Sequence, residues 1–163
     1  MTGTFDHPKV ALPLAGLRVL DFSRLLPGPW CTQMLGDLGA EVIKIEQPET
    51  GDFSRHNPPT YRSGSVYFHS VNRNKSSLSL DLSKPEGREI AHRLIESADV
   101  LVESFRRGVP ARLGIDYDAA SAIKSDLIYC SITGFGQSGT YADIPGHDLV
   151  VQAATGLIGV AAS

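Results

Sequence analysis

The chain has 163 residues, of which 42% are hydrophobic and 20% are charged, and its formal net charge at pH 7 is −3. This length fits one domain, and a domain of this size buries about 70% of the surface that its unfolded chain exposes, which is enough for a real core. The charge gives no support for binding to nucleic acid or to a membrane surface, and no apolar run is long enough to span a bilayer.

The first predicted unit is a strand, a helix and a second strand. An apolar stretch at 17–22 fits a buried strand, and the Pro-Gly-Pro sequence at 27–29 interrupts it sharply. Residues 30–38 have helical character, and Gly39 suits the position just beyond the end of a helix. Residues 42–45 restore the strand pattern. A strand–helix–strand unit of this length implies parallel strands and a right-handed crossover.

The rest of the chain continues this alternation. Residues 47–65 are rich in proline, glycine, serine and charge, and we expect them to form a long loop. Ser83 and Glu86 match a capping box at the start of a helix. Strands are expected at 78–82, 100–102 and 127–132, and helices at 83–97, 109–113, 118–124 and 148–154. The alternation predicts an α/β fold with an open, mainly parallel, Rossmann-like sheet flanked by helices.

The chain divides into a loose N-terminal arm at 1–12 and one domain at 13–163. The segment 149–162 is strongly apolar and stops without a polar cap, which indicates that its packing partner is missing from this chain. We therefore expect the domain to be incomplete at its C-terminus. The alternative is a complete small protein that buries this segment in an oligomer.

Polar side chains follow several of the predicted strands. Ligands of open parallel sheets gather at the carboxyl ends of the strands, which places residues 23–26, 46–47 and 104–108 in candidate ligand crevices. Three arginines lie within seven positions, at Arg106, Arg107 and Arg112. Guanidinium groups match phosphate oxygens, so this cluster suits a phosphate ligand, and a solvated basic loop is the alternative.

The glycine-rich sequence at 134–139 satisfies the pattern G-x-G-x-x-G and follows a predicted strand. A dinucleotide fingerprint also needs a helix that opens at the third glycine and an acidic residue about twenty positions further on. Here Pro145 disfavours the helix, and no acidic residue lies beyond Asp148. We therefore exclude a nicotinamide dinucleotide site.

His147 follows the glycine-rich segment, and a histidine side chain can exchange its proton near neutral pH. A lone histidine has a structural role more often than a chemical one. Asp148 suits the cap of the helix that follows.

Ordered motifs over about residues 13 to 160 resemble the family III CoA-transferases, the group that includes formyl-CoA transferase, the carnitine CoA-transferases and α-methylacyl-CoA racemase. The resemblance implies the N-terminal part of the large domain of that family. The segments that carry it, in chain order, are 16–29, 38–46, 51–52, 72–76, 80–82, 85–87, 98–105, 112–114, 127–129, 134–139 and 146–152.

The resemblance implies a set of positions that contact coenzyme A. Leu80 also suits the core, and Leu25 and Leu26 also suit an ordinary turn. Some family members carry an arginine where Gln47 stands, and many carry an asparagine where Ser104 stands. The implied contact residues are Arg24, Leu25, Leu26, Gln47, Leu80, Ser104, Phe105 and Arg112.

The implied function is transfer of CoA between an acyl-CoA and a carboxylic acid through an aspartyl anhydride and an aspartyl-CoA thioester. The family's nucleophilic aspartate is expected beyond the end of this chain, so we expect the chain alone to be inactive. One alternative is a 2-methylacyl-CoA racemase in which His147 is an acid/base residue. A second alternative is a non-catalytic CoA-binding or dimerising fragment.

The expected partners are an acyl-CoA, a carboxylic acid and a second copy of the chain, because full-length relatives form interlinked dimers. We expect no metal site, no nucleic-acid or membrane partner and no permanently bound cofactor, since CoA is a substrate in this family. Cys31 and Cys130 are far apart in the sequence and fit reduced thiols, and the N-terminus lacks the pattern of a secretory signal. These features predict a cytoplasmic protein.

Overall fold

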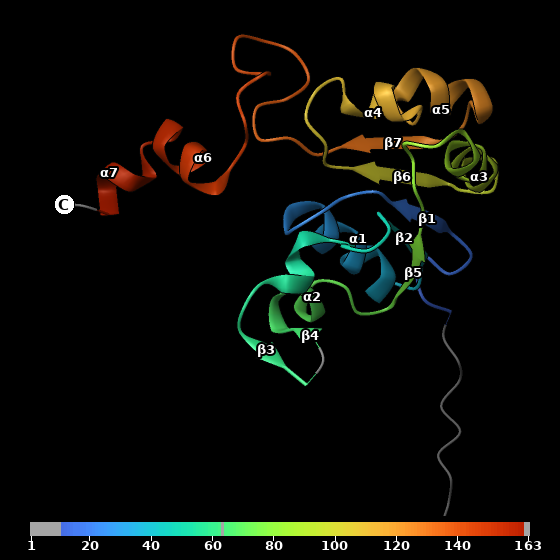
Figure 1. Cartoon of the computed structure of the whole chain (residues 1–163), viewed down its shortest axis with the longest axis horizontal. Helices are drawn as coiled ribbons and strands as arrows, with labels where there is room; N and C mark the ends of the chain where they lie inside the picture. The colour runs from blue at the N-terminus through green and yellow to red at the C-terminus, as the bar shows by residue number, and fades with distance from the viewer. Residues whose placement is uncertain (1–10, 63, 162–163) are drawn as a thin grey trace, which may run out of the picture.

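The structure, a computed structural model, describes residues 11–62 and 64–161. Its centre is a five-stranded sheet in which all neighbouring strands are parallel (Figure 1). The strands, in their spatial order, are β5 (Lys75–Ser79), β2 (Glu41–Glu46), β1 (Arg18–Asp21), β6 (Val100–Glu103) and β7 (Ile128–Ser131). The expected open parallel sheet is thus confirmed, and its direction of winding reverses between β1 and β6.

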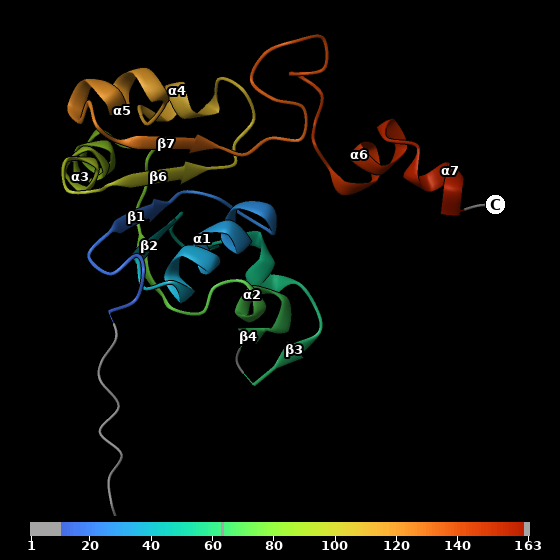
Figure 2. The ribbon, with the colours of Figure 1, turned by 180° about the vertical axis from the view of Figure 1, so that it is seen from behind.

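Helices cover both faces of the sheet (Figures 1 and 2). On one face lies α1 (Pro27–Asp37), and on the other lie α3 (Pro85–Glu96), α4 (Val109–Leu113) and α5 (Tyr117–Ile123). Successive side chains of β1 alternate between the two cores, because Val19 joins the cluster that contains Leu35 of α1 and Leu20 joins the cluster of α3 and α5. Such strands are buried on both faces, as their continuous apolar runs predict.

Two glycines fix the ends of α1. The helix begins at Pro27, three residues before the expected start at 30, and Gly28 lies so close to Ser23 that a Cβ there would overlap the serine side chain. The proline supplies a backbone angle that suits the first helical turn. Gly39 has a φ of +104° just beyond the helix, as the sequence predicts.

The strand β5 lies earlier in the chain than expected. It spans Lys75–Ser79, so the expected strand at 78–82 is wrong at residues 80–82 and misses residues 75–77. Ser79 pairs with Glu46, the last residue of β2, so the backbone beyond Leu80 has no strand to pair with. The apolar alternation continues past this point because Leu80 still packs in the core.

The prediction of a capping box at the start of α3 is also wrong. Lys84 occupies the cap position and makes no capping hydrogen bond with its side chain. The hydroxyl of Ser83 instead donates to the carboxylate of Asp81, at 2.6 Å. A serine that bonds its own turn is a frequent alternative to a helix cap.

The segment expected as a long loop contains short elements. They are the 3-10 helix η1 (Phe53–His56) and a small hairpin of β3 (Thr60–Tyr61) and β4 (Gly64–Ser65), followed by α2 (Val66–Ser70). Ser65 caps α2 by accepting a hydrogen bond from the amide of Phe68, at 3.2 Å.

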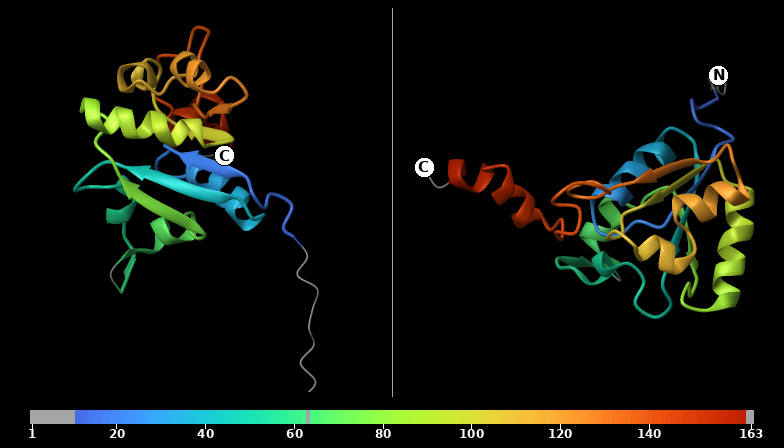
Figure 3. Two further views of the ribbon diagram at one scale, coloured as in Figure 1. Left: turned by 90° about the vertical axis from the view of Figure 1, so that its right-hand side faces the viewer. Right: turned by 90° about the horizontal axis from the view of Figure 1, so that it is seen from above.

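The last two helices, α6 (Asp148–Ala154) and α7 (Leu157–Ala161), extend away from the sheet (Figure 3). Asp148 is the first helical residue and accepts a hydrogen bond from Gln152, so it does not cap α6 as expected. Part of the expected N-terminal arm, residues 1–10, lies outside the described residues. In the described part of the chain, no helix combines the length and the apolar character needed to cross a membrane.

Candidate functional site

The turns that follow β1 and β6 lie side by side at the point where the winding of the sheet reverses. The amide of Arg24 donates to the hydroxyl of Ser104 at 3.0 Å, and each residue lies close to the carboxyl end of its strand. Such switch points leave a crevice outside the strand ends, because the crossovers leave in opposite directions. The predicted residues Arg24 and Ser104 are therefore brought together.

A cavity of about 160 Å³ opens at these strand ends. It contains Arg24, Gln47, Leu80 and Phe105 from the set expected to contact coenzyme A. The full lining is Phe22, Arg24, Ile45, Glu46, Gln47, Leu80, Asp81, Leu82, Ser83, Phe105 and Leu113. We call this space the Arg24 cavity.

The guanidinium of Arg24 is the unpaired cation of this cavity. It lies over the rings of Phe105 and Phe53, with 4.9 Å and 5.6 Å from its central carbon to the ring centroids. Among residues 11–62 and 64–161, no carboxylate lies within 4.0 Å of it. Burial lowers the pKa of Arg24, and Asp52 partly offsets this, but an arginine keeps its charge in proteins. A half-buried cation held between two aromatic rings is suited to bind an anion.

The other expected contact residues lie around the cavity and not in it. Leu25 and Leu26 are 41% and 42% exposed at the tip of the turn after β1. Arg112 is exposed on α4, and its neighbour Leu113 lines the cavity in its place. Arg107, a member of the arginine cluster expected to suit a phosphate, lies near a carboxylate instead, with 3.7 Å between its Nη1 and Oδ1 of Asp143.

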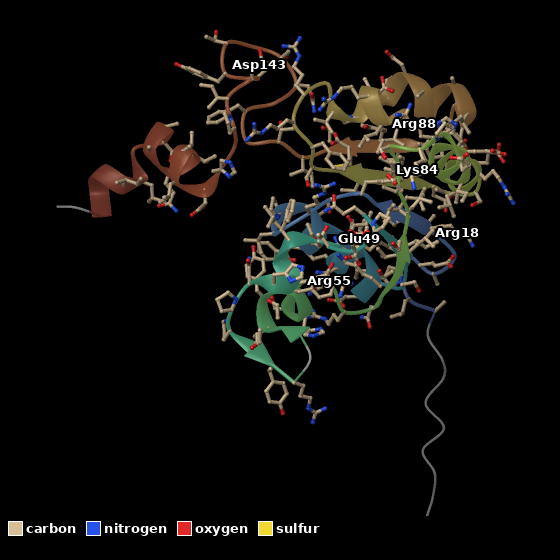
Figure 4. All side chains as sticks on the ribbon, viewed as in Figure 1. Arg18, Glu49, Arg55, Lys84, Arg88 and Asp143 are labelled. Carbon is tan, nitrogen blue, oxygen red and sulfur yellow. The ribbon has the colours of Figure 1, made fainter. Side chains whose placement is uncertain are left out.

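A buried carboxylate forms one wall of the Arg24 cavity. Glu46, which is 6% exposed, accepts two hydrogen bonds from Arg55 at 2.6 and 2.7 Å and one from Ser77 at 2.6 Å. Burial raises the pKa of Glu46, but these bonds and that from the Asp52 amide outweigh it and lower the pKa to about 2. Arg55, which Figure 4 labels, in turn stacks on Phe68 of α2, with 3.8 Å from its central carbon to the ring centroid.

Two buried lysines lie beneath the turns. Lys75 Nζ is 3.0 Å from Oδ2 of Asp21, and Lys44 Nζ is 3.0 Å from Oδ2 of Asp52. Asp21 also accepts a hydrogen bond from Thr32 at 2.6 Å. This network was not predicted. The available signal was a charged residue inside an apolar strand, Asp21 in β1 and Lys44 in β2, because a charge in a strand covered on both faces needs a partner.

A second cavity, of about 350 Å³, lies on the other side of α4. Its lining includes carboxylates and no cation, and we call it the Glu103 cavity. Burial raises the pKa of Glu103 more than the polar groups of Ser131 and Phe105 lower it. The lining is Glu103, Gly108, Pro110, Ala111, Asp116, Tyr117, Asp118, Tyr129, Ser131 and Gln137.

The glycine-rich segment forms a closed loop. A Cβ added to Gly134 would lie 2.7 Å from the Cα of Gly146, so the loop closes where these two glycines meet. No helix begins at Gly139, which confirms that the segment is not a dinucleotide fingerprint. His147 is exposed at the start of α6 and lines neither the Arg24 cavity nor the Glu103 cavity.

Comparison with known proteins gives a consistent result. The family model described as "CoA-transferase family III" matches residues 14–163. The chain is 45% identical over 162 residues to a succinate–glutarate CoA-transferase of Agrobacterium fabrum, covering 95% of this chain and 40% of the relative. It is 44% identical to the human succinyl-CoA:glutarate CoA-transferase, over 90% of this chain and 34% of the relative.

The fold has a close match among solved structures. A CaiB/BaiF family protein from Brucella suis is 45% identical and superposes with a TM-score of 0.85, covering 90% of this chain and 40% of that protein. The expected fold class is thereby confirmed. The chain spans well under half of the length of these relatives.

Proposed function

Because the chain belongs to CoA-transferase family III, we propose that it is the coenzyme A-binding part of an enzyme that transfers CoA from an acyl-CoA to a carboxylic acid. The observation that carries this proposal is the unpaired guanidinium of Arg24 in a cavity at the switch point of the sheet. CoA carries a 3′-phosphate and a pyrophosphate, and arginine is the side chain best matched to phosphate oxygens.

The size and lining of the cavity support one part of CoA as its occupant. Ligand pockets that enclose a whole molecule measure about 300–1,000 Å³, and the Arg24 cavity has about 160 Å³. Leu80 and Phe105 offer apolar surface for the adenine ring, and Gln47 offers an amide at the rim. The rest of CoA would then lie along the exposed turn that carries Leu25 and Leu26.

In the proposed reaction, a carboxylate of the whole enzyme attacks the thioester carbonyl, the C–S bond breaks, and CoA leaves as a thiolate. The thiolate attacks the enzyme's side of the anhydride, which releases the donor acid and leaves an enzyme–CoA thioester. The acceptor acid reverses these two steps and departs as its CoA thioester. We infer that the part of the relatives not covered by this chain supplies the attacking aspartate. The chain alone is then expected to bind CoA without turnover.

The acid that exchanges CoA is proposed to be a dicarboxylic acid. The two transferases described above carry succinate or succinyl-CoA and glutarate in their names. The racemase alternative lacks comparable support, because His147 is exposed and lies outside the Arg24 cavity. The experiments therefore test the CoA-transferase function.

A second copy of the chain is the proposed partner of the last two helices. The large apolar side chains of this segment are exposed, with Leu149 at 69%, Leu157 at 55% and Ile158 at 42%. Exposed apolar surface of this kind is typical of an interface. Sedimentation should show self-association of the chain, and a monomer at all concentrations would contradict this part of the proposal.

Calorimetry of the chain with CoA, 3′-dephospho-CoA and NADH tests the binding function. We expect CoA to bind, and 3′-dephospho-CoA to bind more weakly if the 3′-phosphate meets Arg24 and equally well if the pyrophosphate does. NADH shares the adenosine pyrophosphate of CoA but lacks its 3′-phosphate and pantetheine arm, so we expect it to bind more weakly than CoA. A folded chain, checked by circular dichroism, that binds NADH as tightly as CoA, or that binds no CoA, would overturn the proposal. Turnover by the isolated chain would overturn the inference about the attacking aspartate.

A further inference from the structure

The turn that carries Arg24 is held from several sides by side chains of other segments. The carbonyl oxygen of Ser23 accepts a hydrogen bond from Lys44 Nζ at 2.9 Å. The next amide, that of Arg24, donates to Ser104 at 3.0 Å. The amide of Leu25 donates to both carboxylate oxygens of Asp52, at 3.2 Å each. Three consecutive residues are thus each bonded to a different part of the chain.

Leu25 has a backbone conformation that leucine rarely adopts. Its φ is +65°, in the left-handed region that favours glycine. A residue in such a conformation persists only where the surroundings hold it there. Leu25 is held by the carboxylate of Asp52, because both carboxylate oxygens accept a hydrogen bond from the Leu25 amide. Without it, we expect the turn to relax and the neighbouring Arg24 to move.

Asp52 is itself fixed by a buried ion pair. Lys44 and Asp52 are 1% and 2% exposed, and Nζ and Oδ2 are 3.0 Å apart. The backbone and the hydroxyl of Ser54 also donate to Asp52, at 2.9 and 2.7 Å. A buried ion of this kind depends on its partner, because removing one member leaves an uncompensated charge in the interior. The ammonium group of Lys44 also donates a hydrogen bond to the carbonyl oxygen of Ser23, so the ion pair contacts the turn at both Ser23 and Leu25.

Neither member of the pair lines the Arg24 cavity. The pair therefore does not contact a ligand there, and it acts through the turn and through the charge of Asp52, which also acts on Arg24. We propose that Lys44 and Asp52 are positioning residues that preset the turn at 23–26, so that the Arg24 guanidinium is already in place between its two aromatic rings when CoA arrives. This inference rests on the proposed function of the Arg24 cavity. A site preset in this way binds more tightly because less freedom is lost on binding.

The test compares Asp52→Ala with Asp37→Ala in the chain. Asp37 is an exposed carboxylate that pairs with Arg73 at 2.5 Å and does not touch the turn, so it serves as a matched control. We expect Asp52→Ala to weaken CoA binding about tenfold and Asp37→Ala to leave it unchanged. Asp52→Asn keeps an oxygen for the Leu25 amide and should fall between them. If Asp52→Ala does not fold, the CoA affinity of Asp52→Asn is compared with that of Asp37→Ala instead.

A double-mutant cycle separates positioning from a general loss of structure. If Asp52 acts through Arg24, then Asp52→Ala should have almost no further effect on CoA affinity in an Arg24→Gln background. Additive effects would overturn the proposal. Hydrogen exchange at the Leu25 amide gives an answer independent of CoA, because Asp52→Ala should remove its protection. Retained protection would refute the positioning role, whereas absence of CoA binding by the unmodified chain would refute the proposed function alone.

Discussion

Two buried glutamates end the two strands that flank β1, and their pKa values are shifted in opposite directions. Glu46 ends β2 at 6% exposure, and Glu103 ends β6 at 1% exposure. Arg55 and Ser77 compensate the first, so its pKa falls to about 2. No cation lines the cavity of the second, and burial raises its pKa. Burial alone therefore does not determine whether a carboxyl group at a strand end is ionised, because this also depends on whether a cation pairs with it.

The same contrast separates the two cavities. The Glu103 cavity is the larger, at about 350 Å³, but its charged lining consists of Glu103, Asp116 and Asp118. The Arg24 cavity is smaller and contains an unpaired guanidinium. The carboxylates that line the Arg24 cavity, Glu46 and Asp81, each have a cationic partner, so a phosphate group is attracted to Arg24 there and repelled by the carboxylates of the Glu103 cavity. Charge and position in the sheet, and not volume, therefore identify the candidate CoA site.

The largest expected effect is on stability at the compensated glutamate. Glu46→Gln should lower the free energy of unfolding at pH 7 by about 3 kcal/mol, because the folded pKa of about 2 lies well below the unfolded value of 4.5. Glu49→Gln, in the exposed loop beside it (Figure 4), should change stability little. Urea unfolding of the two variants measures the difference.

The pH dependence of the same variant sharpens this prediction. A depressed folded pKa contributes stability that is complete above about pH 5 and is lost as the pH falls from 4.5 toward 2. Glu46→Gln should therefore flatten the acid limb of the stability curve. An unchanged acid limb would contradict the compensated state of Glu46.

The next effect in size is on binding. Arg24→Gln should weaken CoA binding about 10- to 100-fold, since a hydrogen bond to a charged group contributes about 1.5–3 kcal/mol. Arg106→Gln is the matched control, because Arg106 is an exposed arginine that lines neither cavity. Equal losses in the two variants would show that general positive charge, and not the site, attracts CoA. Isothermal calorimetry at two salt concentrations distinguishes these cases.

The smallest effect is expected at the uncompensated glutamate. Because the folded pKa of Glu103 is raised, its contribution to stability falls as the pH rises from 4.5 through the folded pKa. Glu103→Gln should remove this loss and stabilise the chain at pH 7 by about 1 kcal/mol. The CoA affinity should stay within about twofold of the original, since Glu103 does not line the Arg24 cavity. A marked loss of CoA affinity would indicate that CoA binds in the Glu103 cavity, which would contradict the proposal.

The strands of the sheet were predictable because they are covered on both faces. The apolar runs at 17–22, 42–45 and 100–102 each match a central strand. The edge strand β5 was misplaced because its apolar alternation extends beyond the end of β2, its pairing partner. A pattern of side chains reports packing, and the end of a strand depends on backbone pairing with a distant segment.

The candidate site was predictable only in part. The rule for strand ends located Arg24, Gln47 and Phe105, and the resemblance to a family added Leu80. A charge inside an apolar strand, such as Lys44, indicates that a partner exists, but which groups it bonds was not predictable, because the fold brings Lys44, Asp52 and the turn at Ser23 together. The cluster of arginines at 106–112 suggested phosphate binding, but its members do not line the Arg24 cavity.

The most direct test of the account is to map the CoA site on the chain by NMR. Titration of the ¹⁵N-labelled chain with CoA should shift the amide signals of Arg24, Phe105 and Leu113, which border the Arg24 cavity, and leave those of Tyr117 and Tyr129 in the Glu103 cavity unchanged. Shifts confined to Tyr117 and Tyr129 would contradict the central claim that the cation at the switch point of the sheet receives CoA.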